Sequence, residues 1–118
     1  MNIESIRKYC LLKKGISEGF PFDDVTLVFK VMGKMFALIN IDKMESINLK
    51  CEPDVALELR ASFPEIVLPG WHMNKKHWNT IKLDDSTDKE FIFKWIDHSY
   101  DEVVKTLSKK LLEEFRKL

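Results

Sequence analysis

The chain has 118 residues, the size of one domain, and 45% of them are hydrophobic, which is enough for one substantial core. Its 19 basic residues balance 19 acidic ones, so the net charge is zero and a strongly basic nucleic-acid-binding protein is excluded. No apolar run approaches the roughly 20 residues of a membrane-spanning helix, and the polar start does not fit a secretory signal. We therefore expect a single domain over residues 1–118, located in the cytoplasm without a membrane partner.

The first half of the chain predicts one helix followed by a three-stranded sheet. Ile3, Ile6 and Cys10 recur at helical spacing, and Gly15 closes that segment. Three later segments alternate apolar and polar side chains with a period of two, which predicts strands: 25–31, 35–41 and 46–51. Gly33 lies between the first two strands and suits the tight turn Met32–Lys34 of a hairpin.

The alternation also assigns each side chain of these strands to one face of the sheet. The inward face is apolar, whereas the outward face is mixed and reads Thr26, Val28, Lys30, Phe36, Leu38, Asn40, Ser46, Asn48 and Lys50. A sheet with one apolar face suits a two-layer sandwich with helices on that face.

The second half predicts a short helix over 54–61, short strands over 66–68 and 77–83, and two final helices. Thr87 with Glu90 and Ser99 with Glu102 match the capping box, which places those helices at about 88–98 and 100–116. Apolar residues of the last segment form a continuous helical stripe, in which Leu107 is expected in the core. Because alternating βαβ units are absent, the fold class is α+β with an antiparallel sheet.

The residues that carry enzyme chemistry form no recognisable motif here. Two cysteines, Cys10 and Cys51, sit in apolar patterns and are expected to be reduced core thiols. Neither they nor His72 and His77 have the spacing of metal ligands. No nucleophile–base pattern and no phosphate-binding glycine loop is present. We expect no catalytic residues, no metal, no cofactor and no enzyme activity.

The segment from Pro69 to Thr80 is unusually rich in aromatic, basic and amide side chains, with two Trp, two His, two Asn and two Lys. Residues 66–83 contain three lysines and no acid, so this region is locally basic. One interpretation is that the lysines contact phosphates and the indoles contact bases. The other is that Trp71 and Trp78 are core anchors and only the lysines reach water. The residues alone favour neither.

Several motifs in the same order resemble the MmcQ/YjbR family of small bacterial proteins. They run from about Phe20 to Leu107: Phe29-Lys-Val-x-Gly-Lys-Met-Phe-Ala-Leu38, Asn48-Leu-Lys-Cys-x-Pro53, Pro69-Gly-x-His-Met-Asn-Lys-Lys-His-Trp78 and Ser99-Tyr100. The resemblance implies a CyaY-like two-layer fold and DNA binding by a "double wing", two hairpins that embrace a duplex. Position 71, often Tyr in the family, is Trp71 here, so the aromatic character is kept and a phenolic hydroxyl is lost.

Carried onto this chain, the resemblance places one wing at Met32–Lys34 and the other at 73–78. The implied DNA-binding residues are Lys34, Lys75, Lys76, His77 and Trp78, of which Trp78 would stack on bases only if it is exposed. The residues that shape the loops would be Gly33, Gly70, His72 and Asn74. Double-stranded DNA is the expected partner. The alternative is a protein-interaction or small-ligand-binding domain that uses the mixed face of the sheet.

Overall fold

A computed structural model describes residues 2–85 and 87–118 and shows an α+β fold with a six-stranded, fully antiparallel sheet. The strand order is β1-β2-β3-β4-β6-β5. The elements in chain order are α1 (Ile3–Leu11), β1 (Ile16–Gly19), β2 (Thr26–Val31), β3 (Lys34–Asn40), β4 (Ser46–Lys50), α2 (Pro53–Ser62), β5 (Val67–Pro69), β6 (Trp78–Lys82), α3 (Lys89–Val104) and α4 (Lys109–Arg116).

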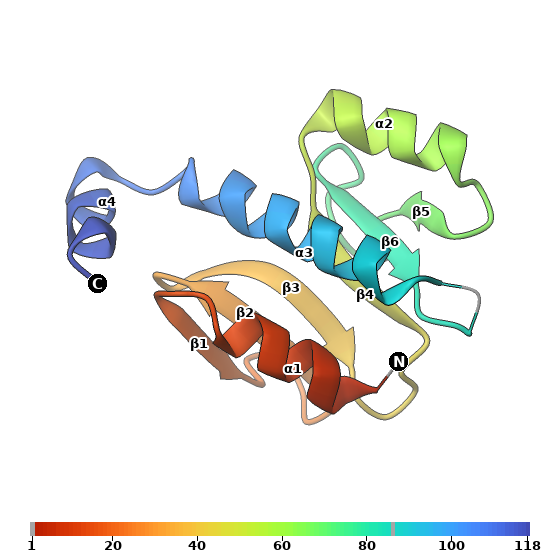
Figure 1. Cartoon of the computed structure of the whole chain (residues 1–118), viewed down its shortest axis with the longest axis horizontal. Coiled ribbons are helices and arrows are strands. Elements are labelled where there is room, and N and C mark those ends of the chain that lie inside the picture. Colours follow the sequence, from red (N-terminus) through yellow and green to blue (C-terminus); the bar gives the residue numbers. More distant parts are fainter. Residues whose placement is uncertain (1, 86) are drawn as a thin grey trace.

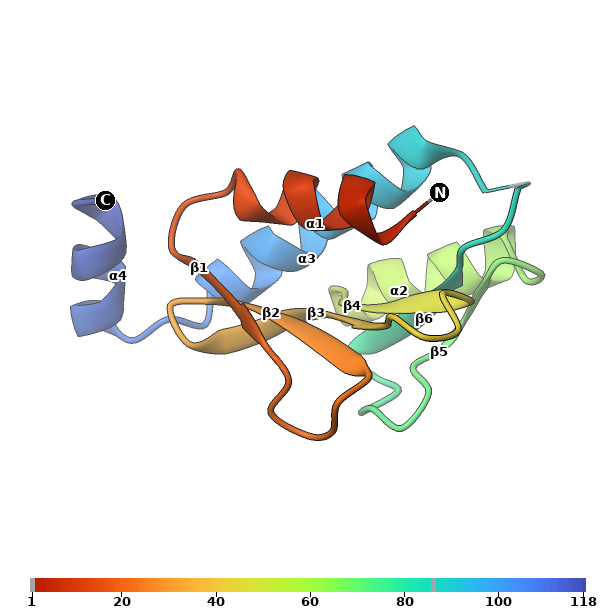
Figure 2. The same cartoon turned by 90° about the horizontal axis from the view of Figure 1, so that it is seen from below.

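The molecule has two layers, as expected for an apolar sheet face that must be covered. Helices α1 and α3 run across one face of the sheet and α2 lies beside the β5–β6 edge on the same side (Figures 1 and 2). The main core lies between these layers, and its largest fully buried side chains include Phe29, Phe36, Ile47 and Ile92. None of the described helices covers the opposite face, which is called the open face below. No helix in the described part of the chain is long and apolar enough to cross a membrane.

The sequence pattern does not predict the first strand, β1. It follows Gly15, whose φ of +78° lets the chain reverse after α1, and pairs with β2 in the register Ile16↔Val31. Its four residues, Ile-Ser-Glu-Gly, are too few to establish an alternation. Gly15 therefore begins a strand connection rather than closing α1, which ends at Leu11.

The alternation predicts Phe36 on the outward face, and this prediction is wrong. The β2–β3 register shifts between Phe29 and Lys30, with pairs Phe29↔Ala37 and Lys30↔Met35, so Phe36 is the extra residue of a β-bulge. Both Phe36 and Ala37 consequently face the helices and are fully buried. Before and after the bulge the alternation holds, with Met35 and Leu38 on the open face.

The predicted boundary between the last two helices is also wrong. Ser99 lies inside α3, where its hydroxyl donates to the Phe36 carbonyl at 2.5 Å and accepts from the Lys50 amide at 2.8 Å. It thus bridges β3 and β4 beside the bulge, which explains a serine in mid-helix. Asp88, not Thr87, caps the start of α3, since its carboxylate accepts from the Glu90 amide at 3.2 Å.

The C-terminal apolar stripe spans the end of α3 and a separate short helix. α4 begins after Ser108, whose hydroxyl accepts from the Leu111 amide at 3.2 Å. Leu107 is buried at 8% exposure in the connecting turn, as expected. None of the α4 residues is fully buried, and Phe115 only packs against the edge of the core. Figure 1 accordingly shows α4 at one end of the molecule, beyond the sheet.

Candidate functional site

Two loops project from the open face, away from the helices (Figure 2). Residues 20–25 join β1 to β2, and residues 70–77 join β5 to β6. Each loop carries a large aromatic side chain in solvent, because Phe22 is 63% exposed and Trp71 is 69% exposed. Exposed rings that gather on one face are typical of an interaction surface rather than of a solvated loop.

The two loops and the sheet between them form a cleft of about 500 Å³, within the range of small-molecule sites. Met35 and Leu38 supply apolar surface from β3, and Phe22 and Trp71 line the cleft from the two loops. Hydroxyl and amide side chains from the strands also line it, namely Thr26, Asn40, Ser46 and Asn48. The lining is therefore apolar and aromatic with a few polar groups.

The backbone of Trp71 is fixed to the sheet although the residue is 69% exposed. The Trp71 amide donates to Thr80 Oγ1 at 2.8 Å, and Asn48 Nδ2 donates to the Trp71 carbonyl at 3.3 Å. Thr80 Oγ1 in turn donates to Asn48 Oδ1 at 2.6 Å. One small network from β4 and β6 thus positions the exposed indole.

The loop 70–77 is shaped by the residues that the family resemblance singled out. A Cβ on Gly70 would lie 2.7 Å from the Trp78 Cβ and 2.8 Å from its carbonyl oxygen, so only glycine fits there. His72 has a left-handed backbone, with φ of 59°. The Asn74 side chain accepts from the Lys76 amide at 3.0 Å, forming an Asx turn. Gly33, the fourth of these residues, has φ of +84° in the β2–β3 turn at another loop.

Arg60 also holds the loop, and no sequence pattern pointed to it. It projects from α2, and its Nε donates to Asn79 Oδ1 at 2.6 Å. Its Nη2 donates to the carbonyls of Lys75 and Trp78. The guanidinium links the end of α2 to the base of the loop. The spacing of these segments in the sequence does not predict this contact.

The other loop is closed by Asp23. Its Oδ1 accepts from the amides of Val25 and Thr26 at 3.0 and 2.6 Å, and its Oδ2 from Thr26 Oγ1 at 3.1 Å. These hydrogen bonds, the one from the Thr26 amide foremost, lower the pKa of the Asp23 carboxyl. The loop thus presents a carboxylate beside Phe22 at the cleft.

The structure separates the predicted DNA-contacting cations. Lys34 faces the helical side of the sheet, where its Nζ donates to the Thr106 carbonyl at 2.9 Å near the end of α3. Met35, the next residue, packs on the open face with Met73 of the loop 70–77. Lys75 and Lys76 are exposed on that loop. Lys34 is therefore not brought together with the other two lysines on one face.

The remaining predicted contacts, His77 and Trp78, are partly withdrawn from solvent. The His77 carbonyl accepts from the Cys51 amide at 2.7 Å, and the residue is half-buried. Trp78 is only 8% exposed and packs against Val28 and Leu38 in a small apolar cluster on the open face. Its ring is an anchor for the loop, whereas the exposed indole belongs to Trp71.

Lysines missed by the site prediction lie on the open face. Lys30, Lys50 and Lys82 follow the strand positions that alternate away from the core. Among the strand residues on this face there is no aspartate or glutamate. The alternation already placed Lys30 and Lys50 outward, so the signal was present in the sequence. What the sequence lacked was the information that both projecting loops share this face.

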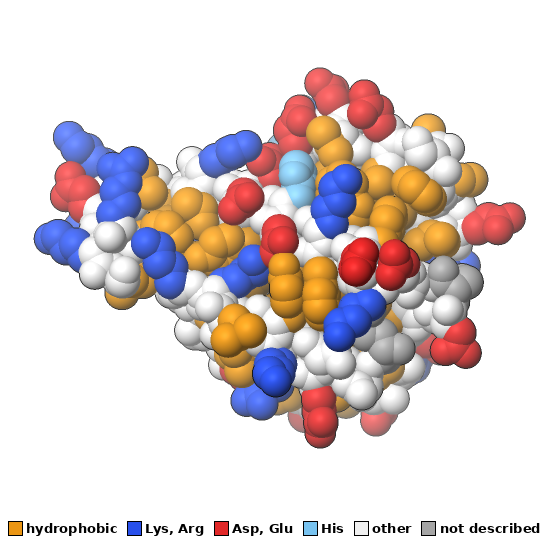
Figure 3. Space-filling view, viewed as in Figure 1, with side chains coloured by type: hydrophobic (Ala, Val, Ile, Leu, Met, Phe, Trp, Pro, Cys, Tyr) orange, Lys and Arg blue, Asp and Glu red, His pale blue; other side chains and the backbone are white. Residues whose placement is uncertain are grey.

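The helical side of the molecule has a different electrostatic character. Figure 3 shows this side, with acidic side chains gathered over α2 and basic ones over α4 at the far end. The acids of α2 include Asp54 and Glu58, and the bases of α4 include Lys109, Lys110 and Arg116. Charges of both signs are thus spread over this side, in contrast to the strand positions of the open face.

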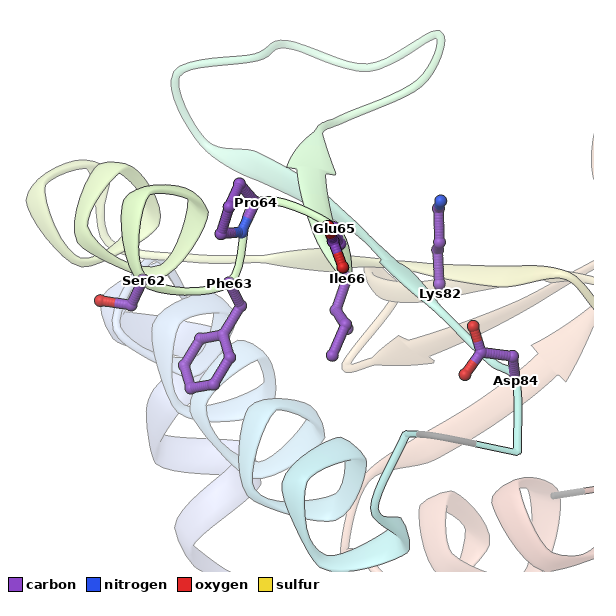
Figure 4. A pocket seen from close by; sticks show the side chains of 7 residues that line it. All are labelled: Ser62, Phe63, Pro64, Glu65, Ile66, Lys82 and Asp84. Atoms are coloured by element: carbon purple, nitrogen blue, oxygen red, sulfur yellow. The ribbon is translucent and has the colours of Figure 1, made fainter.

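A second hollow, of about 590 Å³, lies where α2 turns into β5. Its side chains do not converge on a common point (Figure 4): Phe63 and Ile66 point toward α3, whereas Lys82 points to the opposite side of the sheet. A binding site needs polar groups aimed at one ligand, so this hollow is a weaker candidate than the cleft.

The two cysteines are buried, Cys10 in the main core and Cys51 directly after β4. Both are free and buried, and burial raises the pKa of the Cys10 thiol to about 12 and that of Cys51 to about 11. They are therefore poor nucleophiles. Among the described residues, no group of three His, Cys, Asp or Glu side chains is arranged to hold a metal ion.

Comparisons with known proteins agree on one family. The YjbR family model matches residues 11–102. The YjbR protein of Escherichia coli (strain K12) is 33% identical over 119 residues, covering 100% of this chain and 97% of that protein. YbdF of E. coli O157:H7 is 35% identical over 108 residues, covering 91% and 88% of the two chains. The crystal structure of Deinococcus radiodurans DR2400, with a DUF419 domain, matches at a TM-score of 0.89 with 37% identity, covering 97% of this chain and 87% of that one.

Proposed function

The chain belongs to the YjbR family, and we propose that this member binds DNA through the open face of its sheet. The proposal keeps the idea of two projecting elements but takes the loops 20–25 and 70–77 for them, because these two share one face (Figure 2). Binding is proposed without catalysis, since Asp23, Thr26 and Asn48 at the cleft hold the two loops in place.

The observation that carries the proposal is the charge of the open face. Lys30, Lys50 and Lys82 stand on its strands without a neighbouring strand carboxylate, and Lys75 and Lys76 extend the positive surface onto the loop. Each lysine contacts a phosphate as a point charge and carries no base preference. A protein with zero net charge can therefore bind DNA locally, with an affinity that falls steeply as salt increases.

The test is a fluorescence anisotropy titration of labelled DNA at two salt concentrations. Changing Lys30, Lys50 and Lys75 together to Gln should weaken binding at low salt and lower the salt slope by up to about three charge units. The matched control is Lys34→Gln, a lysine of the neighbouring strand that faces the helices and binds Thr106. If Lys34→Gln weakens binding as the triple change does, the open face is not the contact surface.

A second candidate function is supported by the cleft itself. A volume of about 500 Å³ with an apolar, aromatic lining would also suit a small ligand or the side chain of a protein partner. Failure of the wild-type protein to bind any DNA at about 50 mM salt would favour this alternative, because non-specific phosphate contacts are strong under those conditions.

A further inference from the structure

We infer that the cleft between the loops 20–25 and 70–77 receives an unpaired DNA base that carries an exocyclic amino group, stacked against Trp71 and Phe22. The inference rests on the proposed function and deepens it: the preferred partner is single-stranded DNA containing cytosine, adenine or guanine, rather than an intact duplex. Four features of the open face support it.

The first feature is the pair of exposed rings. Phe22 and Trp71 come from different loops, line the same cleft and keep 63% and 69% of their surface in solvent. Every base has two flat faces that stack on aromatic side chains. In a duplex these faces are already covered by neighbouring base pairs, so only an unpaired base can use both rings.

The second feature is the rigid placement of Trp71. Its amide and carbonyl are held by Thr80 and Asn48, and Gly70 packs directly against Trp78. His72, which follows it, has a left-handed backbone and packs edge-on against the indole with ring centroids 4.7 Å apart. Strained backbone next to an exposed ring is typical of functional sites. A ring whose backbone is ordered before binding loses less conformational entropy when a base stacks on it.

The third feature is the acidity of the first loop. Asp23 and Asp24 lie beside Phe22 near the tip of the loop. If this loop embraced a duplex, the two carboxylates would approach the phosphates and be repelled by them. A carboxylate is instead a good acceptor for the amino group of a base. Of the roughly four acceptor positions of a carboxylate, Asp23 uses three on its own loop, which leaves Oδ2 able to accept one more hydrogen bond.

The fourth feature is the position of the lysines relative to the cleft. Lys30 pairs in register with Met35, which lines the cleft, and Lys50 pairs with Trp78. The positive charges therefore flank the apolar part of the open face. A single strand can place one base between the loops while its phosphates follow these lysines, which is the arrangement of sheet surfaces that bind single strands.

The experiment compares labelled oligonucleotides made only of cytosine, only of thymine, and a mixed duplex, with free dCMP as competitor. We expect the cytosine strand to bind more tightly than the duplex, and about 5-fold more tightly than the thymine strand, the value of one hydrogen bond. Trp71→Ala should weaken single-strand binding by about 5- to 150-fold, the value of one stacked base. Trp71→Phe should restore part of this loss.

Matched variants separate the cleft from the rest of the loop. Phe22→Ala should weaken binding, whereas Phe20→Ala should not, because Phe20 is 46% exposed on the same loop and does not line the cleft. Asp23→Asn keeps Oδ1 for the loop amides and replaces the free acceptor by an amino donor. It should therefore reduce the preference for cytosine over thymine without loss of folding, checked by thermal unfolding.

The outcomes distinguish this inference from the function on which it rests. Lysine-dependent binding of duplex and single strand with equal affinity, or single-strand binding unchanged by Trp71→Ala, overturns the inference and leaves DNA binding standing. Free dCMP that binds as tightly as the cytosine strand also overturns it, because the cleft then takes a nucleotide without needing a strand. Absence of binding to every oligonucleotide overturns both.

Discussion

The two faces of the sheet use alternate residues of the same strands for opposite purposes. On the helical face, Phe29, Phe36 and Ile47 are fully buried beneath α1 and α3 in the main core. On the open face, the buried hydrophobic side chains of the described strands are Val28, Leu38 and Trp78, which form a small cluster with Met73 of the loop 70–77. The stability of the domain therefore resides mainly on one face, which leaves the other free to carry exposed aromatic rings and uncompensated lysines.

This division depends on the register of the strands, because a shift of one residue exchanges the two faces. The bulge at Phe36 changes the face of every residue before it relative to those after it. Ser99 bridges the strands at this point by bonding to Phe36 and Lys50. A serine of the helical layer thus helps to keep Met35 and Lys50 on the open face.

A matched pair of leucine truncations should give the largest difference in stability between the two faces of the sheet. Leu49 on β4 faces the helices at 2% exposure, and Leu38 on β3 faces the open side at 7%. Leu49→Ala should reduce the free energy of unfolding by about 2–5 kcal/mol because it leaves a cavity in the main core. Leu38→Ala should lose less, since the loop above it can settle. Urea denaturation measures both.

For DNA binding, we expect the opposite order of effects from these two substitutions. Leu38 lines the cleft and Leu49 does not, so at temperatures where both variants are folded only Leu38→Ala should alter binding to DNA. Equal losses of stability, or a larger loss for Leu38→Ala, would show that the open-face cluster is a second core of comparable weight.

A smaller change in stability is expected from removing one of two buried hydroxyls, those of Ser99 and Thr80. Ser99→Ala removes a partner from the Phe36 carbonyl and the Lys50 amide, so we expect a loss of about 1–3 kcal/mol in the free energy of unfolding. Thr80→Val keeps the side-chain shape on the open face and releases the Trp71 amide. We expect it to weaken single-strand binding more than Ser99→Ala does. A Ser99→Ala protein of unchanged stability would contradict the bridging role.

Much of the fold follows from periodicity alone. The central strands, the hairpin turn at Gly33 and the burial of Leu107 could be predicted because alternation and helical spacing are local signals. The errors at Phe36 and Ser99 have one common cause, which is that a tertiary contact replaced a local rule. Phe36 turned inward through a bulge paired with another strand, and Ser99 stayed in mid-helix because its hydroxyl bonds to the sheet.

The candidate site was only partly predictable for a related reason. The basic, aromatic segment 69–80 stands out by composition, and it does form one loop of the cleft. The loop containing Phe22 and Asp23 carries no such signal, because it joins the cleft only through the pairing of β1 with β2. Nor can spacing show that Lys34 points to the helices, whereas the bulge and the Thr106 contact do so in the structure.

The smallest expected effect is a pH dependence of stability. Its sign differs between the two sides of the sheet, because the pKa of Tyr9 is raised and that of Asp23 is lowered. Tyr9, on the helical side, stacks on Phe93 with ring centroids 3.9 Å apart and donates to the Asp97 carboxylate at 2.7 Å. Partial burial, followed by this hydrogen bond, raises the pKa of Tyr9 from 10.0 to about 12. A raised pKa in the folded state means that the contribution of Tyr9 to stability is complete below pH 10 and is lost as the pH rises toward 12.

Tyr9→Phe should therefore destabilise the protein slightly at neutral pH, by less than about 1 kcal/mol because the hydroxyl is partly exposed. The difference between the wild type and the variant should shrink between pH 10 and 12, the interval given by the shift. Urea denaturation of both proteins across this interval measures it, since other groups titrate alike in the two. Asp23 on the open side has a lowered pKa, so its contribution is lost toward acid instead. A constant difference between wild type and Tyr9→Phe up to pH 12 would show that the Tyr9–Asp97 contact does not govern the alkaline limb.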